Sequence, residues 1–501
     1  MKLSLHSPWI ILFFGAFFFV LTAWKSTGYH HGDEQHQILE WAGLKLGFNQ
    51  PEDLPWEFRD QIRPCLQPTL AYIFISAITA VSGLLPFEGE VSPYTLAFIL
   101  RLITSGLSFG VLTFLFLVMR KKVPRGAPRS LFLASFFFLW FLPYLSVRFS
   151  SETWGGLFLA LALALFLWER TFSLKPFVFG LLLALSFLFR YQMALSILGF
   201  GLYILIFANW PIKKMILASL GFIGTIFLGF ILDSWFYQDL VFSPWNYLNE
   251  TILSSEGPKF GSLPWNFYLI NFFYFPSKFI AYPIGILTIF LLVTRPKSLF
   301  LWLFIPFFIA HSFVPHKELR FMFPMAFLIP LLIYESYVSL RRFELPYRGA
   351  VLRGLSLIFL VLNLPLLILF SQKPAGVGRM EITQFIHNQH QEKEVHLIYA
   401  DWANPYDPWH GLTTNFYLPE GMSRTRISSV CEVRPSLIQP NRVNLLVIRK
   451  FHKTKVDCVE NLNSLGFDFK VQSIPEWMEP HLKHHDQWQN NRILELYQYE
   501  K

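Results

Sequence analysis

Two adjacent carboxylates, Asp33 and Glu34, lie directly after the first hydrophobic segment of this chain. Ionised groups are costly near hydrocarbon, so a chain with many apolar segments keeps them there only where something compensates for the cost. A helix that begins near Asp33 would place Asp33, Gln37 and Glu40 on one face, because residues three and four apart are neighbours on a helix. Catalysis at a membrane surface is one candidate for what compensates this cost.

Two other interpretations of this segment stay open. Asp33 suits the N-terminus of a helix, where a carboxylate bonds free backbone N–H groups and offsets the helix dipole. His36 and Glu40 are four residues apart and lie close to His30 and His31, and these residue types can bind a metal ion. No further ligand set has a recognisable spacing, so we predict no metal and no cofactor.

Further polar groups stand at the ends of other apolar runs. They are Trp56-Glu57-Phe58, Arg63, Arg190, Asp233 with Tyr237, Gly261-x-x-Pro264-Trp265, and His316-Lys317-Glu318-Leu319-Arg320-Phe321. Aromatic residues that sit at the membrane interface, and basic side chains that reach out of it, would explain each group singly. A single arginine within a membrane segment is also a candidate functional residue.

The composition indicates a membrane protein. Of the 501 residues, 53% are hydrophobic and 15% are charged, and 56 are Phe. The net charge of +9 comes from basic clusters between apolar runs, a distribution typical of cytoplasmic loops near anionic lipids. We therefore expect membrane lipids, and not nucleic acid, as partners.

A membrane span needs roughly 20 apolar residues. The candidate runs are 8–24, 68–87, 93–119, 130–147, 154–168, 176–190, 192–210, 214–235, 268–293, 298–314, 320–339 and 351–371. The first resembles an uncleaved signal anchor. The basic loops near Arg120, Arg170, Lys213, Arg295 and Arg341 are expected to be cytoplasmic.

This orientation requires that one run does not cross. If 68–87 crossed, the basic loop at Arg120 would lie outside, so we predict that 68–87 lies in the outer leaflet. About eleven spans remain, with a large first extracytoplasmic loop and every polar group named above on the extracytoplasmic side.

The polar tail, residues 372–501, is expected to be a small extracytoplasmic α/β domain that follows a membrane domain of residues 1–371. Two apolar runs, 395–400 and 443–448, indicate buried strands, and 381–390 and 459–465 indicate short helices. Cys431 and Cys458 lie in this tail and can pair if it is extracytoplasmic.

Together these groups resemble glycosyltransferase family 22, which has the GT-C fold and uses polyprenyl-phosphate-mannose. Within it, the chain is most similar to the glycosylphosphatidylinositol mannosyltransferases that add the third mannose. The family's first motif is matched by Asp33-Glu34, Gln37 and Glu40, and its His-Lys-Glu-x-Arg-Phe element by His316–Phe321. Two motifs depart from the family's pattern. Pro55 stands where the family has a Thr before Trp-Glu-Phe, and the residue after Arg190 is not the Pro that the family has there.

The resemblance implies a polytopic α-helical GT-C enzyme that transfers mannose, with inversion, from a polyprenyl- or dolichyl-phosphate donor to a glycan or glycolipid acceptor. A phosphate leaving group needs cations more than a general acid. We therefore predict Asp33 as the base, with Glu34 as an alternative base or acceptor ligand. The predicted phosphate ligands are Lys317, Arg320, Arg190 and Arg63, and the predicted substrate contacts are His316, Glu318, Trp56, Glu57, Tyr237 and Trp265.

The resemblance places the enzyme in a bacterial plasma membrane or in the endoplasmic reticulum, with an extracytoplasmic or lumenal active site. The sequence has no G-x-G-x-x-G fingerprint after a strand, which argues against a nucleotide-sugar donor. The alternatives are a GT-C enzyme for another lipid-linked sugar, a lipid-sugar transporter or flippase, and a non-catalytic scaffold. A transporter would be expected to contain broken helices and polar groups near the midplane.

Overall fold

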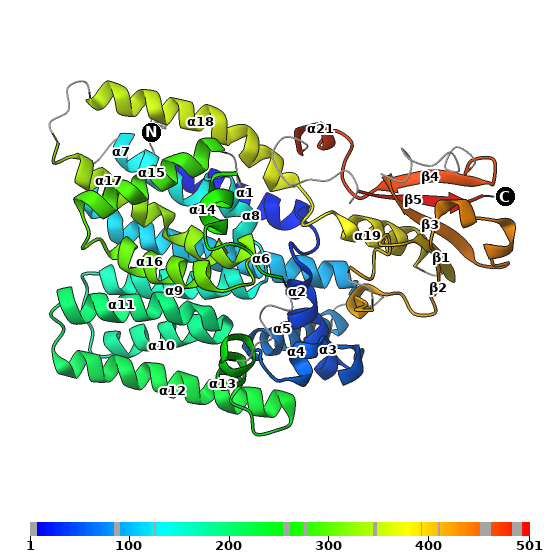
Figure 1. Cartoon of the computed structure of the whole chain (residues 1–501), viewed down its shortest axis with the longest axis horizontal. Coiled ribbons are helices and arrows are strands. Elements are labelled where there is room, and N and C mark those ends of the chain that lie inside the picture. The colour runs from blue at the N-terminus through cyan, green and yellow to red at the C-terminus, as the bar shows by residue number, and fades with distance from the viewer. Residues whose placement is uncertain are drawn as a thin grey trace. The chain divides into compact units, whose positions relative to one another are not determined.

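The computed structural model describes residues 8–84, 91–124, 127–253, 261–274, 278–343, 348–391, 393–408, 411–450, 462–482 and 493–500. Helices fill the chain up to residue 390, and strands begin only at Val395 (Figure 1). The chain divides into two compact units. The first contains 1–22, 60–69 and 101–371, and the second contains 23–59, 70–100 and 372–501. One boundary lies between residues 371 and 372, and much of the first loop groups with the tail. The predicted domains, 1–371 and 372–501, stay a prediction.

The longer helices follow the apolar runs of the sequence. They are α1 (Pro8–Lys25), α5 (Leu66–Gly83), α6 (Pro93–Met119), α7 (Ala127–Phe137), α9 (Ser151–Leu167), α10 (Lys175–Phe189), α11 (Ala194–Phe207), α12 (Ile212–Tyr237), α15 (Lys278–Thr294), α16 (Leu299–Phe313), α17 (Ile329–Leu340) and α18 (Arg348–Gln372). Shorter pieces are α8 (Phe141–Ser146), α13 (Ser243–Leu248), α14 (Phe267–Tyr274) and the 3₁₀ helix η7 (Leu319–Leu328).

Five described helices are long and apolar enough to cross a membrane: α1, α5, α6, α12, and η7 joined to α17. A sixth is possible if the strongly bent pair α15–α16, with 115° between its parts, counts as one span. Several predicted spans are instead short or broken helices, such as α7 followed by α8. The count of eleven, and the outer-leaflet position of 68–87, stay predictions.

In the first unit, α10 packs between α9 and α12, and α11 packs on α16 (Figure 1). A hydrogen bond from Ser186 Oγ to Gly155 O, 2.7 Å long, joins α10 to α9. The chain breaks between α10 and α11 at Arg190 and the 3₁₀ turn η4 (Tyr191–Met193), between the predicted runs 176–190 and 192–210. This packing brings the end of α10 close to the start of α9.

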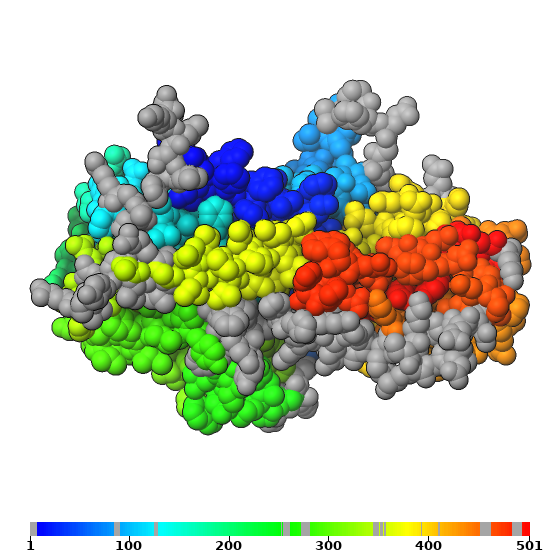
Figure 2. Space-filling view, turned by 90° about the horizontal axis from the view of Figure 1, so that it is seen from above, coloured from blue at the N-terminus to red at the C-terminus, as the bar shows by residue number. Residues whose placement is uncertain are grey.

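Several helices of this unit expose apolar side chains along their length, α12 and α18 among them. On α18 these are Leu357, Ile358, Leu360, Val361, Leu364 and Ile368, and Figure 2 shows this helix at the surface in yellow. On α12 they are Ile212, Ile216, Leu220, Ile223, Phe227, Leu228 and Ile231. Apolar surfaces of this extent favour contact with lipid, which agrees with an integral membrane protein.

The second unit contains a five-stranded sheet in the order β2-β1-β3-β5-β4 (Figure 1). The strands are β1 (Val395–Ala400), β2 (Ser423–Ile427), β3 (Val443–Arg449), β4 (Phe467–Gln472) and β5 (Leu494–Tyr499). β1 is parallel to β2 and β3, whereas β5 runs antiparallel to both β3 and β4. The helix α19 (Arg379–His390) contacts β4 and β5. The predicted strands and the helix at 381–390 are confirmed. Of the predicted helix at 459–465, residues 459–461 lie outside the described residues, and residues 462–465 form a turn.

The loop after α1 packs on this C-terminal part through a buried carboxylate. Glu40 accepts hydrogen bonds from Gln35 Nε2 at 2.7 Å, Asn49 Nδ2 at 2.9 Å and Phe416 N at 3.3 Å. Asn49 also accepts one from Asn415 at 2.7 Å. Burial raises the pKa of Glu40 to about 7 despite these donors, because desolvation disfavours the charged form. The loop and the tail are thus one folded unit.

The cysteines agree with the expected pairing in the tail. Cys431 is disulfide-bonded, and Cys65 is a buried free thiol. The predicted partner of Cys431, Cys458, lies outside the described residues. A disulfide favours an oxidising compartment.

Candidate active site

A carboxylate that the sequence analysis did not select, Glu152, is central to the polar cluster of the first unit. It lies in the first turn of α9, whose N-cap is Ser150; the hydroxyl of Ser150 accepts a hydrogen bond from Thr153 N at 3.3 Å. A carboxylate in a first turn is favoured by the helix dipole. From the sequence alone, Glu152 therefore looks like an ordinary first-turn carboxylate. The signal that could have selected it is its position beside an apolar run, where a carboxylate is costly unless something compensates for its charge.

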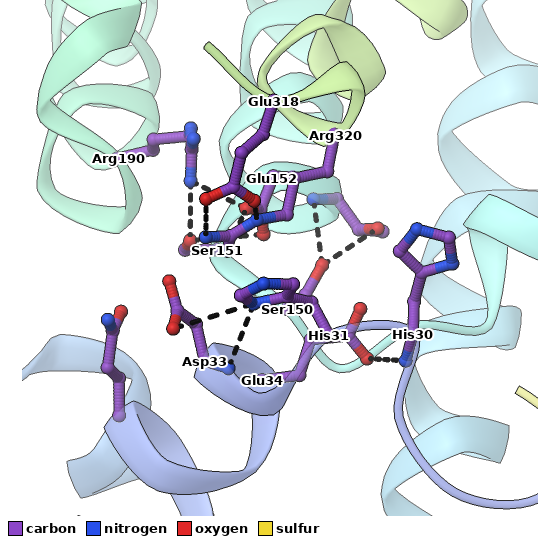
Figure 3. A network of polar contacts seen from close by, with 12 residues as sticks. His30, His31, Asp33, Glu34, Ser150, Ser151, Glu152, Arg190, Glu318 and Arg320 are labelled. Atoms are coloured by element: carbon purple, nitrogen blue, oxygen red, sulfur yellow. Dashed lines mark hydrogen bonds and ion pairs between the residues drawn. The ribbon is translucent and has the colours of Figure 1, made fainter. Parts of the chain in front are cut away.

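Two arginines bind this carboxylate (Figure 3). Arg190 Nη1 lies 2.8 Å from Glu152 Oε1 and 3.1 Å from Ser151 Oγ. Arg320 Nη1 lies 3.2 Å from the same Glu152 oxygen. All three charged side chains are buried. The structure therefore joins two predicted phosphate ligands that are 130 residues apart in the sequence, through a carboxylate that the sequence analysis missed.

Two consecutive glycines allow this approach. A Cβ on Gly156 would lie 2.7 Å from Pro324 O of η7, which follows Arg320. A Cβ on Gly155 would lie 3.2 Å from Arg190 Cβ. The first turns of α9 can therefore pack closely on both elements that carry an arginine.

A second carboxylate balances the charge of the cluster. Glu318 forms a bidentate pair with Arg320, with Oε2 at 2.5 Å from Nε and Oε1 at 3.2 Å from Nη2. His316 Nε2 lies 2.9 Å from Glu318 Oε1. Arg190 and Arg320 are thus matched by Glu152 and Glu318. These contacts place His316 and Glu318 around Arg320, where they fix the orientation of its guanidinium group.

Arg190 retains hydrogen-bonding capacity. Within the described residues, its buried Nε has no hydrogen-bond acceptor. A buried N–H without a partner is costly, and a ligand oxygen would satisfy it. Burial lowers the pKa of Arg190, the Glu152 carboxylate opposes this, and the charges of Arg320 and Arg63 add smaller lowering contributions.

Lys317 has a different environment. Its Nζ lies 2.7 Å from Leu263 O, 2.5 Å from Val314 O and 3.5 Å from Pro315 O. An ammonium group has three donors, and three backbone carbonyls accept them. This geometry favours a role in joining the segments at 263 and 314–317, and a direct phosphate contact would require these bonds to open.

Three other predicted residues of this unit are placed as follows. Arg63 lies with its Cζ 5.9 Å from the ring centroid of Tyr247. Tyr237, the last residue of α12, donates a hydrogen bond to Arg63 O at 2.9 Å, so it holds the arginine's backbone. Trp265 is 60% exposed, which suits an interfacial aromatic or a contact with substrate.

The predicted base belongs to the second unit. The short helix α2 (Gly32–Glu34) has His31, and not Asp33, as its N-cap: Asp33 N donates to His31 Nδ1 at 3.3 Å. The Asp33 carboxylate lies 3.5 Å from His31 Nδ1 and is partly accessible, with 17% of its side chain exposed. Glu34 Oε2 accepts a hydrogen bond from His30 N at 3.1 Å, which fixes its position. Figure 3 labels these four residues.

The continuation of this helix differs from the expectation. Residues Gln35–Glu40 form the π-helix η1, in which residues five apart are paired, so the expected common face of Asp33, Gln37 and Glu40 is wrong. Single π-turns are frequent at functional sites. Gln37 Nε2 donates to Glu57 Oε1 at 3.1 Å. Glu57 and Trp56 begin the helix α4 (Trp56–Arg59), and Glu57 is buried, so its carboxylate holds η1.

The open metal interpretation finds little geometric support in the described residues. Among the described residues, no three His, Cys, Asp or Glu side chains are grouped so that they could hold a metal ion.

A model of the Alg9-like mannosyltransferase family matches residues 9–419. The chain belongs to this family. The predicted resemblance to glycosyltransferase family 22 is thereby confirmed.

The similar curated proteins include "GPI mannosyltransferase 3" of Candida albicans, 24% identical over 322 residues, which are 62% of this chain and 61% of that protein. "GPI mannosyltransferase 3" of Drosophila melanogaster is 26% identical over 358 residues, or 67% of this chain and 57% of that protein. "Mannosyltransferase APTG1" of Arabidopsis thaliana is 29% identical over 345 residues, with 66% and 58% covered. The chain spans about three fifths of the length of these relatives.

Among solved structures, ArnT from Cupriavidus metallidurans bound to undecaprenyl phosphate has a similar fold. Its TM-score is 0.53 at 12% identity, with 97% of this chain and 98% of that chain covered. This similarity confirms the predicted GT-C fold with its C-terminal α/β part.

Proposed function

We propose that this chain transfers mannose from a polyprenyl- or dolichyl-phosphate donor to a glycan or glycolipid acceptor, at the extracytoplasmic or lumenal face of a membrane. The Alg9-like family supports mannose as the sugar. The relatives named GPI mannosyltransferase 3 favour a glycolipid acceptor. The disulfide-bonded state of Cys431 favours an oxidising compartment for the tail, as expected for this face.

The buried cluster around Glu152 is the observation that carries the proposal. Arg190 and Arg320 both bind Glu152 Oε1, at 2.8 and 3.2 Å. Arg190 keeps a buried N–H without an acceptor in the described part of the chain. Guanidinium groups match phosphate geometry and form strong charge-assisted hydrogen bonds with it. A guanidinium cluster beside apolar helices suits the phosphate of a lipid-linked donor.

The reaction needs one base and a stabilised leaving group. The Asp33 carboxylate accepts the proton of the acceptor hydroxyl while that oxygen bonds the anomeric carbon. The bond from this carbon to the phosphate oxygen breaks, and its electron pair stays on the phosphate. Arg190, Arg320 and Arg63 stabilise the developing charge. Displacement from the opposite face inverts the anomeric carbon, so a β-linked donor gives an α-mannoside.

The other predicted residues have supporting roles in this scheme. Glu34 orients the acceptor, and His316 and Glu318 hold Arg320 in place. Glu57 holds the π-helix beyond Asp33, and Tyr237 holds Arg63. Lys317 keeps the turn that precedes Arg320 in shape. Trp56 and Trp265 are the aromatic residues that contact the sugar or the lipid.

The full chain, purified in detergent and returned to nanodiscs, tests the proposal. It is offered polyprenyl-phosphate-linked mannose, glucose and aminoarabinose, and GDP-mannose, with a mannose-terminated glycolipid acceptor. We expect transfer from polyprenyl-phosphate-mannose alone, to a product that an α-mannosidase cleaves. Transfer from GDP-mannose, or a β-linked product, would contradict the scheme. Transfer of a different lipid-linked sugar would support a GT-C glycosyltransferase and would reject mannose as the sugar that it transfers.

A further inference from the structure

The segment that carries Arg63 is held in a strained shape by α12 and by the residues that follow it. Gln61 has a φ of +52°, which is unfavourable for a residue with a side chain. Asn246 Nδ2 donates to Gln61 O at 3.4 Å, and Gln61 Nε2 donates to Asp239 Oδ2 at 3.4 Å. Strained backbone persists only where the surroundings fix it, and it is common at ligand sites.

Asp233 is the buried anchor of this segment. Its Oδ1 accepts a hydrogen bond from Cys65 N at 2.8 Å. Its Oδ2 accepts one from Ser243 Oγ at 2.9 Å and lies 3.5 Å from Tyr191 OH. Asp233 is 2% exposed. Its two oxygens therefore connect the residue two positions after Arg63 with the residue directly after Arg190.

A second contact connects the same two segments. Gln192 Nε2 donates to Tyr247 OH at 2.7 Å, and the guanidinium of Arg63 lies over the ring of Tyr247. Burial is the main cause that lowers the pKa of Arg190, the Glu152 carboxylate opposes it, and the like charge of Arg63 adds a smaller lowering. Like charges that are held together need either fixed surroundings or an anion that both can bind.

We propose that Asp233 is a positioning residue that holds Arg63 and Arg190 as paired ligands of one phosphate group. Asp233 acts through its bonds to Cys65 and Tyr191 and does not touch the phosphate. Its side chain fixes the distance between two guanidinium groups that would otherwise move apart. The identification of the phosphate as that of the sugar donor rests on the proposed function.

The test combines Asp233→Asn with Arg63→Ala in the full-length purified protein. Asparagine keeps an oxygen for Cys65 N, but its amide replaces the acceptor that faces Ser243 and Tyr191. The readouts are the affinity for undecaprenyl phosphate in nanodiscs and the KM values for donor and acceptor. We expect each single variant to weaken undecaprenyl phosphate binding and raise the donor KM about tenfold, the effect of one misplaced charged donor. The acceptor KM should change little.

The double variant decides whether Asp233 acts through Arg63. If it does, Asp233→Asn should weaken binding much less in the Arg63→Ala background than in the wild type. Full additivity would overturn the positioning role. Glu335→Gln is the matched control, because Glu335 is a buried carboxylate of the same unit that bonds Ser298; an equal loss of phosphate binding in this control would also overturn the inference.

Two further measurements keep the test decisive. Tyr237→Phe replaces Asp233→Asn as the test variant if Asp233→Asn does not fold. It removes only the hydroxyl that bonds Arg63 O, and it should raise the donor KM in the same way. An unchanged donor KM in Tyr237→Phe would then overturn the inference. Undecaprenyl phosphate binding requires no sugar transfer. Suppose that the wild-type protein transfers no mannose, but that Asp233→Asn and Arg63→Ala weaken undecaprenyl phosphate binding in a non-additive way. This result would reject the proposed function and support the positioning role. Unchanged binding in Arg63→Ala would reject the paired site itself.

Discussion

Replacement of Glu152 by Gln tests the central cluster most directly. The change keeps the shape of the side chain and removes its charge. Glu152 accepts hydrogen bonds from two buried arginines, so the variant converts a balanced cluster of two positive and two negative groups into one with an excess positive charge. Removal of one partner from a buried ion pair costs about 3–5 kcal/mol.

The amide oxygen of Gln can still accept one of the two bonds, so we expect a loss near ~3 kcal/mol, the lower end of that range. For a large chain this corresponds to a fall of about 3–6 °C in the midpoint of thermal unfolding. The same excess charge should attract an anion more strongly. We therefore expect undecaprenyl phosphate to raise the midpoint of the variant more than that of the wild type.

The assay is thermal unfolding of purified protein with and without undecaprenyl phosphate. Glu169→Gln is the control, because Glu169 pairs with Lys121 at 3.4 Å on the surface, and exposed pairs contribute little. An unchanged midpoint in Glu152→Gln would show that the cluster carries no stability. A lower midpoint that undecaprenyl phosphate does not restore would refute the reasoning that the cluster faces a phosphate.

Three other variants test separate parts of the molecule. Asp33→Asn should reduce mannose transfer by orders of magnitude while thermal stability and undecaprenyl phosphate binding stay at wild-type values, and equal transfer rates would remove Asp33 from the base role. Lys317→Ala should lower the unfolding midpoint, because three carbonyls lose their donor, whereas a raised donor KM at full stability would instead favour a direct phosphate contact. For Glu40, the folded pKa of about 7 lies above the unfolded value of 4.5, so its contribution to stability is full below pH 4.5 and is lost as the pH rises to 7. Glu40→Gln should therefore flatten the pH dependence of stability between pH 5 and 8, and a retained slope in chemical denaturation would contradict this assignment.

The helices and strands that were predicted correctly are those that follow from a run of apolar residues in the sequence. The apolar runs became α1, α6 and α12 with boundaries shifted by a few residues, because spans follow from hydropathy. The runs at 395–400 and 443–448 became buried strands for the same reason. β4 was missed, although Phe467-Asp-Phe-Lys-Val alternates with the period of a half-buried strand.

The candidate site was only partly predictable. Arg190 and Arg320 stood out as charges beside apolar runs, but their common partner Glu152 looks like an ordinary first-turn carboxylate. Lys317 was predicted to bind the donor phosphate, and its three carbonyl acceptors depend on tertiary contacts that no local pattern encodes. The π-turn at Gln35–Glu40 likewise has no clear signature in the sequence, and it changes which side chains share a face.

The bond from Phe416 N to Glu40 connects residues that are 376 positions apart. At a synthesis rate of about 5–20 residues per second, the ribosome needs roughly 20–75 s to add that stretch. In the proposed topology, Glu40 and its loop have by then crossed the membrane without the backbone donor that they bond in the finished protein. On that topology, nascent chains should depend on chaperones on the far side of the membrane, and clones that end shortly before residue 416 should be degraded early even though every helix up to α19 is present.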